Sequence, residues 1–180
     1  MAVVEGSISR FGDALDRWAD RAGQWMESHW LAMLWGAWGA VIGLAALAPA
    51  LASWGAASWA RPIYWTFSWV CHQRPERTFW LAGHPMALCA RDIGLYGGLW
   101  LGGALTAARR VQLSGKVALL CALPLILDGG TQLIGLREST NLLRVITGLL
   151  AGVTAAAYLL SQVGVSRRPS APVMGSERIG

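Results

Sequence analysis

Two cysteines and two histidines fall within nineteen residues of this chain: Cys71, His72, His84 and Cys89. Thiolate and imidazole are the usual ligands of tetrahedral zinc in proteins. The set therefore predicts a metal site, with zinc as the best-fitting ion, although its spacing differs from that of zinc fingers and ribbons. Asp92, three residues after Cys89, is a substitute ligand.

The same two thiols allow other chemistry. Cys71 and Cys89 would form a structural disulfide if this segment faced an oxidising compartment. They could also cycle between dithiol and disulfide, although the chain has no C-x-x-C motif, or they could take no part in function. The third cysteine, Cys121, lies inside an apolar run and is expected in the core.

Polar residues also interrupt two apolar segments further along the chain. Asp128 is predicted about 12 Å and Arg144 about 8 Å from one end of their helices, at a rise of about 1.5 Å per residue. Ionisable groups at such a depth in a membrane usually pair or line a wet cavity. We expect an Asp128–Arg144 ion pair or shared hydrogen-bond network, acting either as a clamp between helices or as the floor of a pocket. The polar side chains expected there are Asp92, Tyr96, Asp128, Gln132, Asn141 and Arg144.

Four arginines belong to the same part of the sequence: Arg74, Arg77, Arg91 and Arg137. Planar guanidinium groups suit phosphate and carboxylate. The arginines would either anchor the protein to lipid headgroups or bind an anionic ligand, such as a headgroup, in the pocket.

The composition predicts that these residues belong to a membrane protein. The chain has 180 residues, of which 54% are hydrophobic and 14% are charged, whereas about a quarter of the residues in a soluble domain are charged. The net charge is +5, but the basic residues flank apolar segments and form no continuous stripe. This pattern argues against nucleic-acid binding.

The hydrophobic pattern predicts an all-α fold, an integral membrane bundle of four transmembrane helices. About 20 apolar residues span a bilayer, and the expected spans are 30–50, 92–108, 116–136 and 140–162. Glycines recur every fourth residue in two of these spans, at Gly94, Gly98 and Gly102 and at Gly148 and Gly152, a spacing that lets helices approach closely.

The remaining segments divide the chain into three parts. Residues 1–28 contain an amphipathic helix, 7–27, which would lie in the membrane interface or pack on protein. Residues 29–163 form the membrane domain, including a Trp-rich Cys/His loop at 54–91, of which 54–80 is expected to run along the membrane surface or to re-enter the membrane briefly. Residues 164–180 are rich in Ser, Pro, Gly and Arg and are expected to be a disordered tail.

Basic residues predict the orientation. With four spans, nine of the 15 Lys and Arg residues fall on the side of both termini and six on the other. The positive-inside rule then places both termini in the cytoplasm and the Cys/His loop outside it. The expected partner is the lipid bilayer, and a membrane-protein partner or a second copy of the chain remains an alternative.

Several short motifs together resemble a family of small prokaryotic membrane proteins, domain of unknown function 2085. The resemblance covers residues from about 65 to 155. The motifs are Cys71-His72-Gln73, Pro75, Arg77-Thr78-Phe79, Cys89-Ala90-Arg91, Gly94, Tyr96, Gly98, Asp128-Gly129, Gln132, Ser139-Thr140-Asn141, Arg144 and Thr147-Gly148. The resemblance implies a further cysteine in many members where this chain has Asp92, and usually serine where it has Thr78. It implies a multi-span protein of the prokaryotic cytoplasmic membrane and supplies no activity.

These observations predict a membrane-bound binding or assembly component with a Cys/His site above a polar pocket. One alternative is a metal-dependent membrane enzyme, in which an open coordination position activates water and Asp92 or Glu76 moves the proton. A second is an accessory subunit of a larger membrane complex, stapled by a Cys71–Cys89 disulfide. A third is a transporter or channel, which would require oligomerisation.

Overall fold

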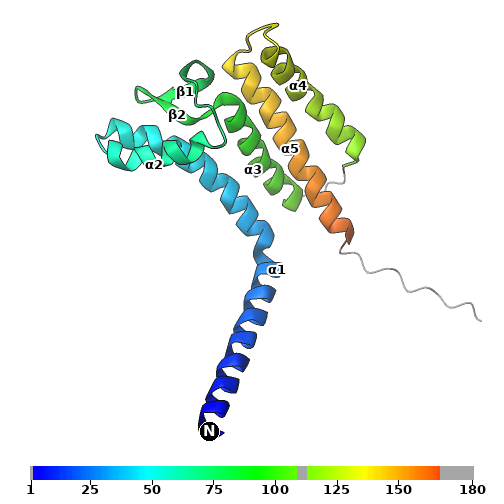
Figure 1. Ribbon diagram of the computed structural model, residues 1–180. Helices are drawn as coiled ribbons and strands as arrows, with labels where there is room; N and C mark the ends of the chain where they lie inside the picture. Colours follow the sequence, from blue (N-terminus) through cyan, green and yellow to red (C-terminus); the bar gives the residue numbers. More distant parts are fainter. Residues whose placement is uncertain (1, 109–112, 167–180) are drawn as a thin grey trace, which may run out of the picture.

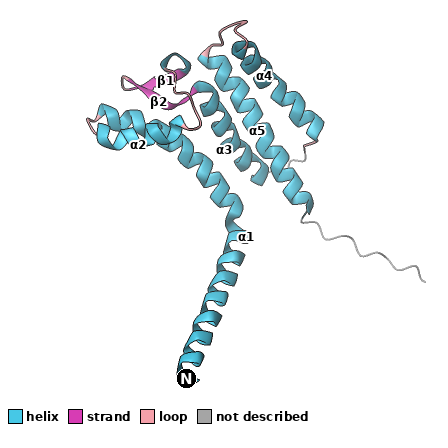
Figure 2. Cartoon of the chain, viewed as in Figure 1, coloured by secondary structure: helices cyan, strands magenta, loops and turns pink. Residues whose placement is uncertain are grey.

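The computed structural model describes residues 2–108 and 113–166. Figure 2 shows a chain built almost entirely of helices, which confirms the all-α prediction, with one small β-hairpin added. The elements are α1 (Ala2–Ser53), α2 (Ala57–Ser68), the 3-10 turn η1 (Pro75–Arg77), β1 (Thr78–Leu81), β2 (His84–Cys89), α3 (Ala90–Ala108), α4 (Gly115–Leu133) and α5 (Asn141–Ser166).

The four long helices alternate in direction. The second half of α1 runs toward the hairpin, α3 runs away from it, α4 returns and α5 runs away again, parallel to α3 (Figure 1). The hairpin, the first turns of α3 and α5 and the last turns of α4 therefore lie together, and we call this region the hairpin end. The N-terminus and the end of α5 lie toward the opposite end.

Glycines join α3 closely to α5, as their spacing predicted. A Cβ atom added to Gly94 or Gly98 would collide with the α5 carbonyl of Val145 or Leu149, respectively. Added to Gly148 or Gly152, it would collide with the backbone of α3. The backbones can approach this closely only because both helices lack side chains at these positions, and this contact sets the register of the two helices.

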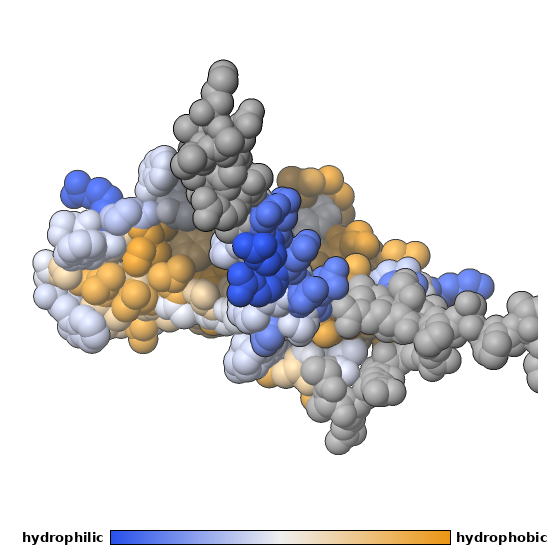
Figure 3. Space-filling view, turned by 90° about the horizontal axis from the view of Figure 1, so that it is seen from below, coloured by the Kyte–Doolittle hydropathy of each residue, from blue (hydrophilic) through white to orange (hydrophobic). Residues whose placement is uncertain are grey.

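Three described helices are long and apolar enough to cross a membrane: Leu15–Ser53 within α1, Gly115–Leu133 and Asn141–Gln162. They agree with three of the four predicted spans. The predicted span 92–108 is a helix, α3, but it is not one of these three, so the four-span count is not confirmed. Large apolar side chains are exposed along α4 and α5, and Figure 3 shows hydrophobic residues over broad parts of the surface.

The predicted amphipathic helix 7–27 is not a separate element. It continues into the first predicted span as one helix, α1, because no Pro or Gly lies between Glu27 and Leu31 to end it. Its apolar residues Leu15, Trp18 and Trp25 are exposed, so this face does not pack on the rest of the chain. Of the predicted tail, residues 164–166 belong to α5 and the others lie outside the described residues.

The segment predicted as a Trp-rich loop, 54–91, contains regular structure. It begins with α2 and ends with an antiparallel hairpin whose register pairs Thr78 with Cys89 and Leu81 with His84. The two turn residues, Ala82 and Gly83, both have positive φ, as the tight turns that suit twisted hairpins require. Ala45 and Ala48 of α1 pack with residues of α2 and β2 in a small core, which fixes the hairpin above the helices.

Candidate functional site

A short loop after α2 positions Cys71. Its backbone N–H donates to the carbonyl of Phe67 at 2.9 Å. Gln73 then adopts a positive φ of 48°, and its amide donates to the carbonyls of Tyr64, at 2.7 Å, and Ala87, at 3.1 Å. These bonds tie the loop to α2 and β2, so that the Cys71 side chain is held inward and is only 5% exposed.

The hairpin positions Cys89. Thr78 is buried, and its hydroxyl donates to the carbonyl of Leu88 at 2.6 Å. The side-chain amide of Asn141, the first residue of α5, donates to the carbonyl of Thr78 at 3.0 Å. Cys89 is thus held where β2 meets α3, and the first turn of α3 adds Asp92 beside it.

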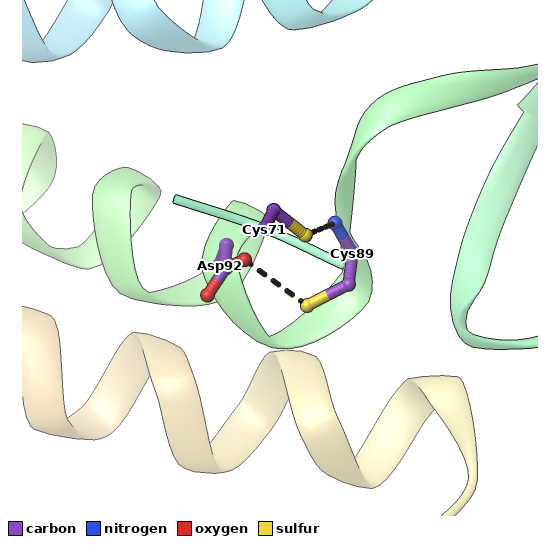
Figure 4. Close-up of side chains that lie close together, drawn as sticks. All are labelled: Cys71, Cys89 and Asp92. Atoms are coloured by element: carbon purple, nitrogen blue, oxygen red, sulfur yellow. Dashed lines mark hydrogen bonds between the residues drawn. The ribbon is translucent and has the colours of Figure 1, made fainter. Parts of the chain in front are cut away.

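Cys71, Cys89 and Asp92 form one cluster (Figure 4). Their sulfur and carboxylate oxygen atoms all lie within 4.8 Å of one another. The Cys89 backbone N–H donates to the Cys71 sulfur at 3.2 Å, and the Cys89 thiol donates to Asp92 Oδ2 at 3.2 Å. Both sulfurs and the carboxylate point toward one shared space, which is the arrangement that a metal ion needs.

Neither predicted histidine ligand belongs to this cluster. His72 is exposed although its neighbour Cys71 is buried, and it is not one of the three clustered side chains. His84 pairs with Leu81 beside the hairpin turn, at the opposite end of β2 from Cys89. Five steps of about 3.3 Å along a strand separate them. Of the predicted ligands, the structure therefore brings Cys71 and Cys89 together with Asp92, and neither His72 nor His84 lies in this group.

The two thiols differ in acidity. A hydrogen bond from the Cys71 thiol to the Cys89 sulfur raises the pKa of Cys71, and burial raises it further. The same bond lowers the pKa of Cys89. Because the first proton lost leaves a thiolate that the second thiol stabilises, Cys89 is the more acidic member of the pair.

Asp128 pairs with arginines other than the predicted one. It is 2% exposed, and its two carboxylate oxygens accept from Arg91 at 2.6 Å and from Arg137 at 2.7 Å. Arg144 instead donates to Asn141 Oδ1 at 2.8 Å. The prediction of an Asp128–Arg144 pair is wrong because depth along the helix says nothing of rotation about its axis, and α3 presents Arg91 to Asp128.

A cavity of about 330 Å³ opens beside the cluster. Side chains from five segments line it: the loop after α2 with η1, the end of β2, the start of α3, the end of α4 and the start of α5. They include Cys71, His72, Gln73, Arg74, Arg77, Cys89, Arg91, Asp92, Gln132 and Arg144, together with Val70 and Leu133. The segments predicted to share one end of the bundle thus meet around a polar space.

The remaining predicted residues lie around this cavity. Tyr96 stacks on Trp38 of α1, with ring centroids 5.5 Å apart, and Asn141 joins the hairpin to Arg144. Arg137 is held by Asp128 and does not line the cavity. Gln73 was not identified from the sequence as the residue that holds the loop in place. A Gln directly after Cys-His, in a loop with few other amide side chains, could have indicated this role.

Comparison with known proteins gives a family without an assigned activity. Residues 71–158 match the model of the family described as predicted membrane protein (DUF2085). An uncharacterized protein of Methanocaldococcus jannaschii is 45% identical over 103 residues, 54% of this chain and 66% of the relative. An uncharacterized protein of Methanothermobacter thermautotrophicus is 42% identical over 90 residues, 48% of this chain and 81% of the relative.

No solved structure matches the chain significantly. This chain spans just under two thirds of the first relative's length and most of the second's. The matched residues begin at Cys71 and include the whole hairpin, α3, α4 and most of α5, so that the cluster and all of the cavity's lining residues except Val70 fall inside them. The chain belongs to the DUF2085 family of predicted membrane proteins.

Proposed function

We propose that this membrane protein binds one zinc ion through Cys71, Cys89 and Asp92. The observation that supports the proposal is the approach of the three ligand atoms to within 4.8 Å of one another. With zinc–sulfur bonds of about 2.3 Å, two ligands of one tetrahedral ion lie about 3.5–4 Å apart. Small side-chain rotations would bring the three groups to that separation.

The ligand chemistry favours zinc over harder ions. Thiolates select zinc, copper(I) and iron–sulfur clusters, whereas magnesium and calcium prefer oxygen ligands. Three protein ligands leave a fourth tetrahedral position, and the three residues line the cavity. A water molecule or an exogenous ligand would take that position, as in zinc sites that bind or activate small molecules rather than purely structural ones.

Metal content per chain tests the proposal. We expect about one equivalent of zinc in detergent-purified protein after zinc loading and desalting, measured by elemental mass spectrometry. Cys89→Ser and Asp92→Asn should lose it, whereas Asp92→Cys should keep it because thiolate is an equally good ligand. Cys121→Ser is the matched thiol control, since Cys121 lies in α4 outside the cluster, and it should keep the metal. No zinc in the wild type, or equal loss in the control, would contradict the proposal.

The same cluster supports one second candidate, a Cys71–Cys89 disulfide or redox pair. Both cysteines are free thiols in the structure, and their sulfurs are close. The two candidates differ in their need for Asp92, which a metal requires and a disulfide does not. Thiol counting on the wild type and on Asp92→Asn separates the two candidates. If neither protein contains metal and two of the thiols do not react in both, the disulfide is favoured.

We further propose that α3 crosses the bilayer beside α5, which gives four spans with both termini in the cytoplasm and the cluster on the extracytoplasmic side. Its 19 residues span about 28 Å, and it packs in parallel on a candidate span. Green fluorescent protein fused to either terminus should fluoresce, and alkaline phosphatase fused after Gly135 should be active. Fluorescence at only one terminus would indicate an odd number of spans and exclude α3.

A further inference from the structure

The cavity at the hairpin end carries an excess of positive charge. Four arginines line it, Arg74, Arg77, Arg91 and Arg144, whereas Asp92 is the one acidic residue among its lining side chains in the described part of the chain. Asp92 in turn accepts a hydrogen bond from the Cys89 thiol.

The neighbouring acidic residues compensate little of this charge. Asp128 is shared by Arg91 and by Arg137, which does not line the cavity. Glu138 lies 3.8 Å from Arg77, but its side chain is 83% exposed, and such pairs contribute little in water. None of the ion pairs among the described residues includes Arg144.

Four buried nitrogen atoms around the cavity lack hydrogen-bond acceptors among the described residues. They are Nε of Arg77, Arg91 and Arg144 and Nε2 of Gln132. All four residues line the cavity. Leaving a buried donor unpaired is unfavourable, so the residues around this cavity retain hydrogen-bond donors that the described residues do not satisfy.

Arg144 is a buried side chain in a fixed position, which distinguishes this cavity from a charged surface patch. Its side chain is 97% buried, since only 3% remains exposed, and Asn141 holds it from one side at 2.8 Å. It stands in the first turn of α5, and Arg91 stands in the first turn of α3. The positive ends of two helix dipoles therefore add to the guanidinium charges.

We propose that this cavity binds a phosphate group, with Arg77, Arg91, Arg144 and Gln132 as its donors. Phosphate offers several acceptor oxygens, and guanidinium groups bind pairs of them in parallel. The cavity is of ligand size, at about 330 Å³, near the lower end of typical small-molecule sites. The site needs no metal, so it stands independently of the zinc proposal.

Two sources could supply the phosphate: a lipid headgroup and a soluble phosphate. Val70 and Leu133 line the cavity beside the arginines, and they are 62% and 87% exposed. A lipid would place its phosphate on the arginines and its acyl chains over these apolar side chains. A soluble phosphate would use the arginines alone.

Binding to purified full-length protein, kept free of metal with a chelator, tests the site. The probes are inorganic phosphate, read by the thermal shift against chloride at equal ionic strength, and phosphatidylglycerol, read by native mass spectrometry. We expect binding of at least one probe to weaken by about tenfold or more in Arg144→Gln, the effect of losing a charged hydrogen bond. Arg61→Gln, an exposed arginine of α2 outside the cavity, should bind as the wild type does.

The two arms also identify the source. Phosphatidylglycerol binding that inorganic phosphate does not displace indicates a lipid headgroup, whereas binding of inorganic phosphate indicates a soluble phosphate. If Arg144→Gln fails to fold, Arg77→Gln, at a more exposed position, provides the same measurement. No binding of either probe by the wild type, or equal weakening in Arg61→Gln, would overturn the proposal.

Discussion

Buried polar groups differ between two regions of the molecule: the contact between α3 and α5, and the hairpin end. Along the helix contact, buried hydroxyls bond within their own helix: Thr106 donates to Gly102 at 2.7 Å, and Thr154 donates to Leu150 at 2.7 Å. At the hairpin end, Arg77, Arg91, Arg144 and Gln132 keep buried nitrogens without acceptors among the described residues. One region is arranged for packing, whereas the other retains hydrogen-bond donors that packing does not use.

The difference has a structural cause. Glycines let α3 and α5 meet backbone to backbone, which leaves no space for a ligand between them. The same contact holds the first turns of the two helices, with Arg91 and Arg144, at a fixed separation. The tight region therefore supports the open one, and variants in the two regions should fail in different ways.

The largest effect is expected from filling the helix contact. Gly152→Leu would force α3 away from α5, because a Cβ at this position already collides with the carbonyl of Leu95. Overpacking of this kind should destabilise the protein by about 3 kcal/mol or more, measured as loss of thermal stability in detergent. Gly43→Leu is the control, since a Cβ there meets no atom within 4 Å. Equal stability of the two variants would contradict the proposed role of the contact.

The next effect is expected at Asp128, which links α3, α4 and the loop before α5. Asp128→Asn removes the charge that compensates Arg91 and Arg137. Breaking a buried ion pair can cost about 3–5 kcal/mol, but Arg137 is 44% exposed and can turn to water, so we expect about 2 kcal/mol. Chemical denaturation in detergent measures the loss. Glu138→Gln, at an exposed position, should change stability by less than about 0.5 kcal/mol. A loss equal to that of Asp128→Asn would contradict the conclusion that Asp128 stabilises the fold through its two arginine partners.

A smaller effect should separate loop geometry from helix packing. Gln73→Ala removes two hydrogen bonds to backbone carbonyls, worth about 1 kcal/mol each, and frees the loop that carries Cys71. We expect a loss of about 1–2 kcal/mol and about tenfold weaker zinc binding in a chelator competition. Gln24→Ala, at an exposed position of α1, should change neither quantity. Unchanged zinc affinity in Gln73→Ala would show that the loop does not position the ligand.

Local sequence patterns predicted the helix contact well. Glycines recur at the spacing of one helix face in each of the two helices: Gly94 and Gly98 in α3, Gly148 and Gly152 in α5. A face of small residues predicts close contact with another helix. The three apolar spans followed from length and composition, whereas the approach of Cys71 to Cys89 was expected only under the metal, disulfide and redox alternatives. The spans and the glycine faces depend on residues that are close together in the chain, and the direction of each helix follows from the order of the spans. A single sequence contains both kinds of information.

The hairpin end could not be predicted in the same detail. Asp128 meets Arg91 because of how α3 and α4 are rotated about their axes, and α5 controls that rotation through distant contacts. The hairpin has no alternating pattern in Thr78–Leu81, and its turn uses Ala82 at a positive φ, which is uncommon for a residue with a side chain. Without the hairpin register, nothing in the sequence placed His84 far from Cys89, so the predicted set included two histidines that lie outside the cluster.

The smallest effect leaves the fold intact and tests whether the hairpin end is chemically distinct. In metal-free Cys121→Ser protein, iodoacetamide should label Cys89 several-fold faster than Cys71 at pH 7. The thiolate is the reactive form, the pKa of Cys89 is lowered and that of Cys71 is raised, and Cys71 is also buried. A rise in pH should therefore increase the labelling rate of Cys71 proportionally more than that of Cys89, as measured by peptide mass spectrometry. Faster labelling of Cys71 would reverse the assigned order of acidity, and added zinc should protect both thiols if they share one ion.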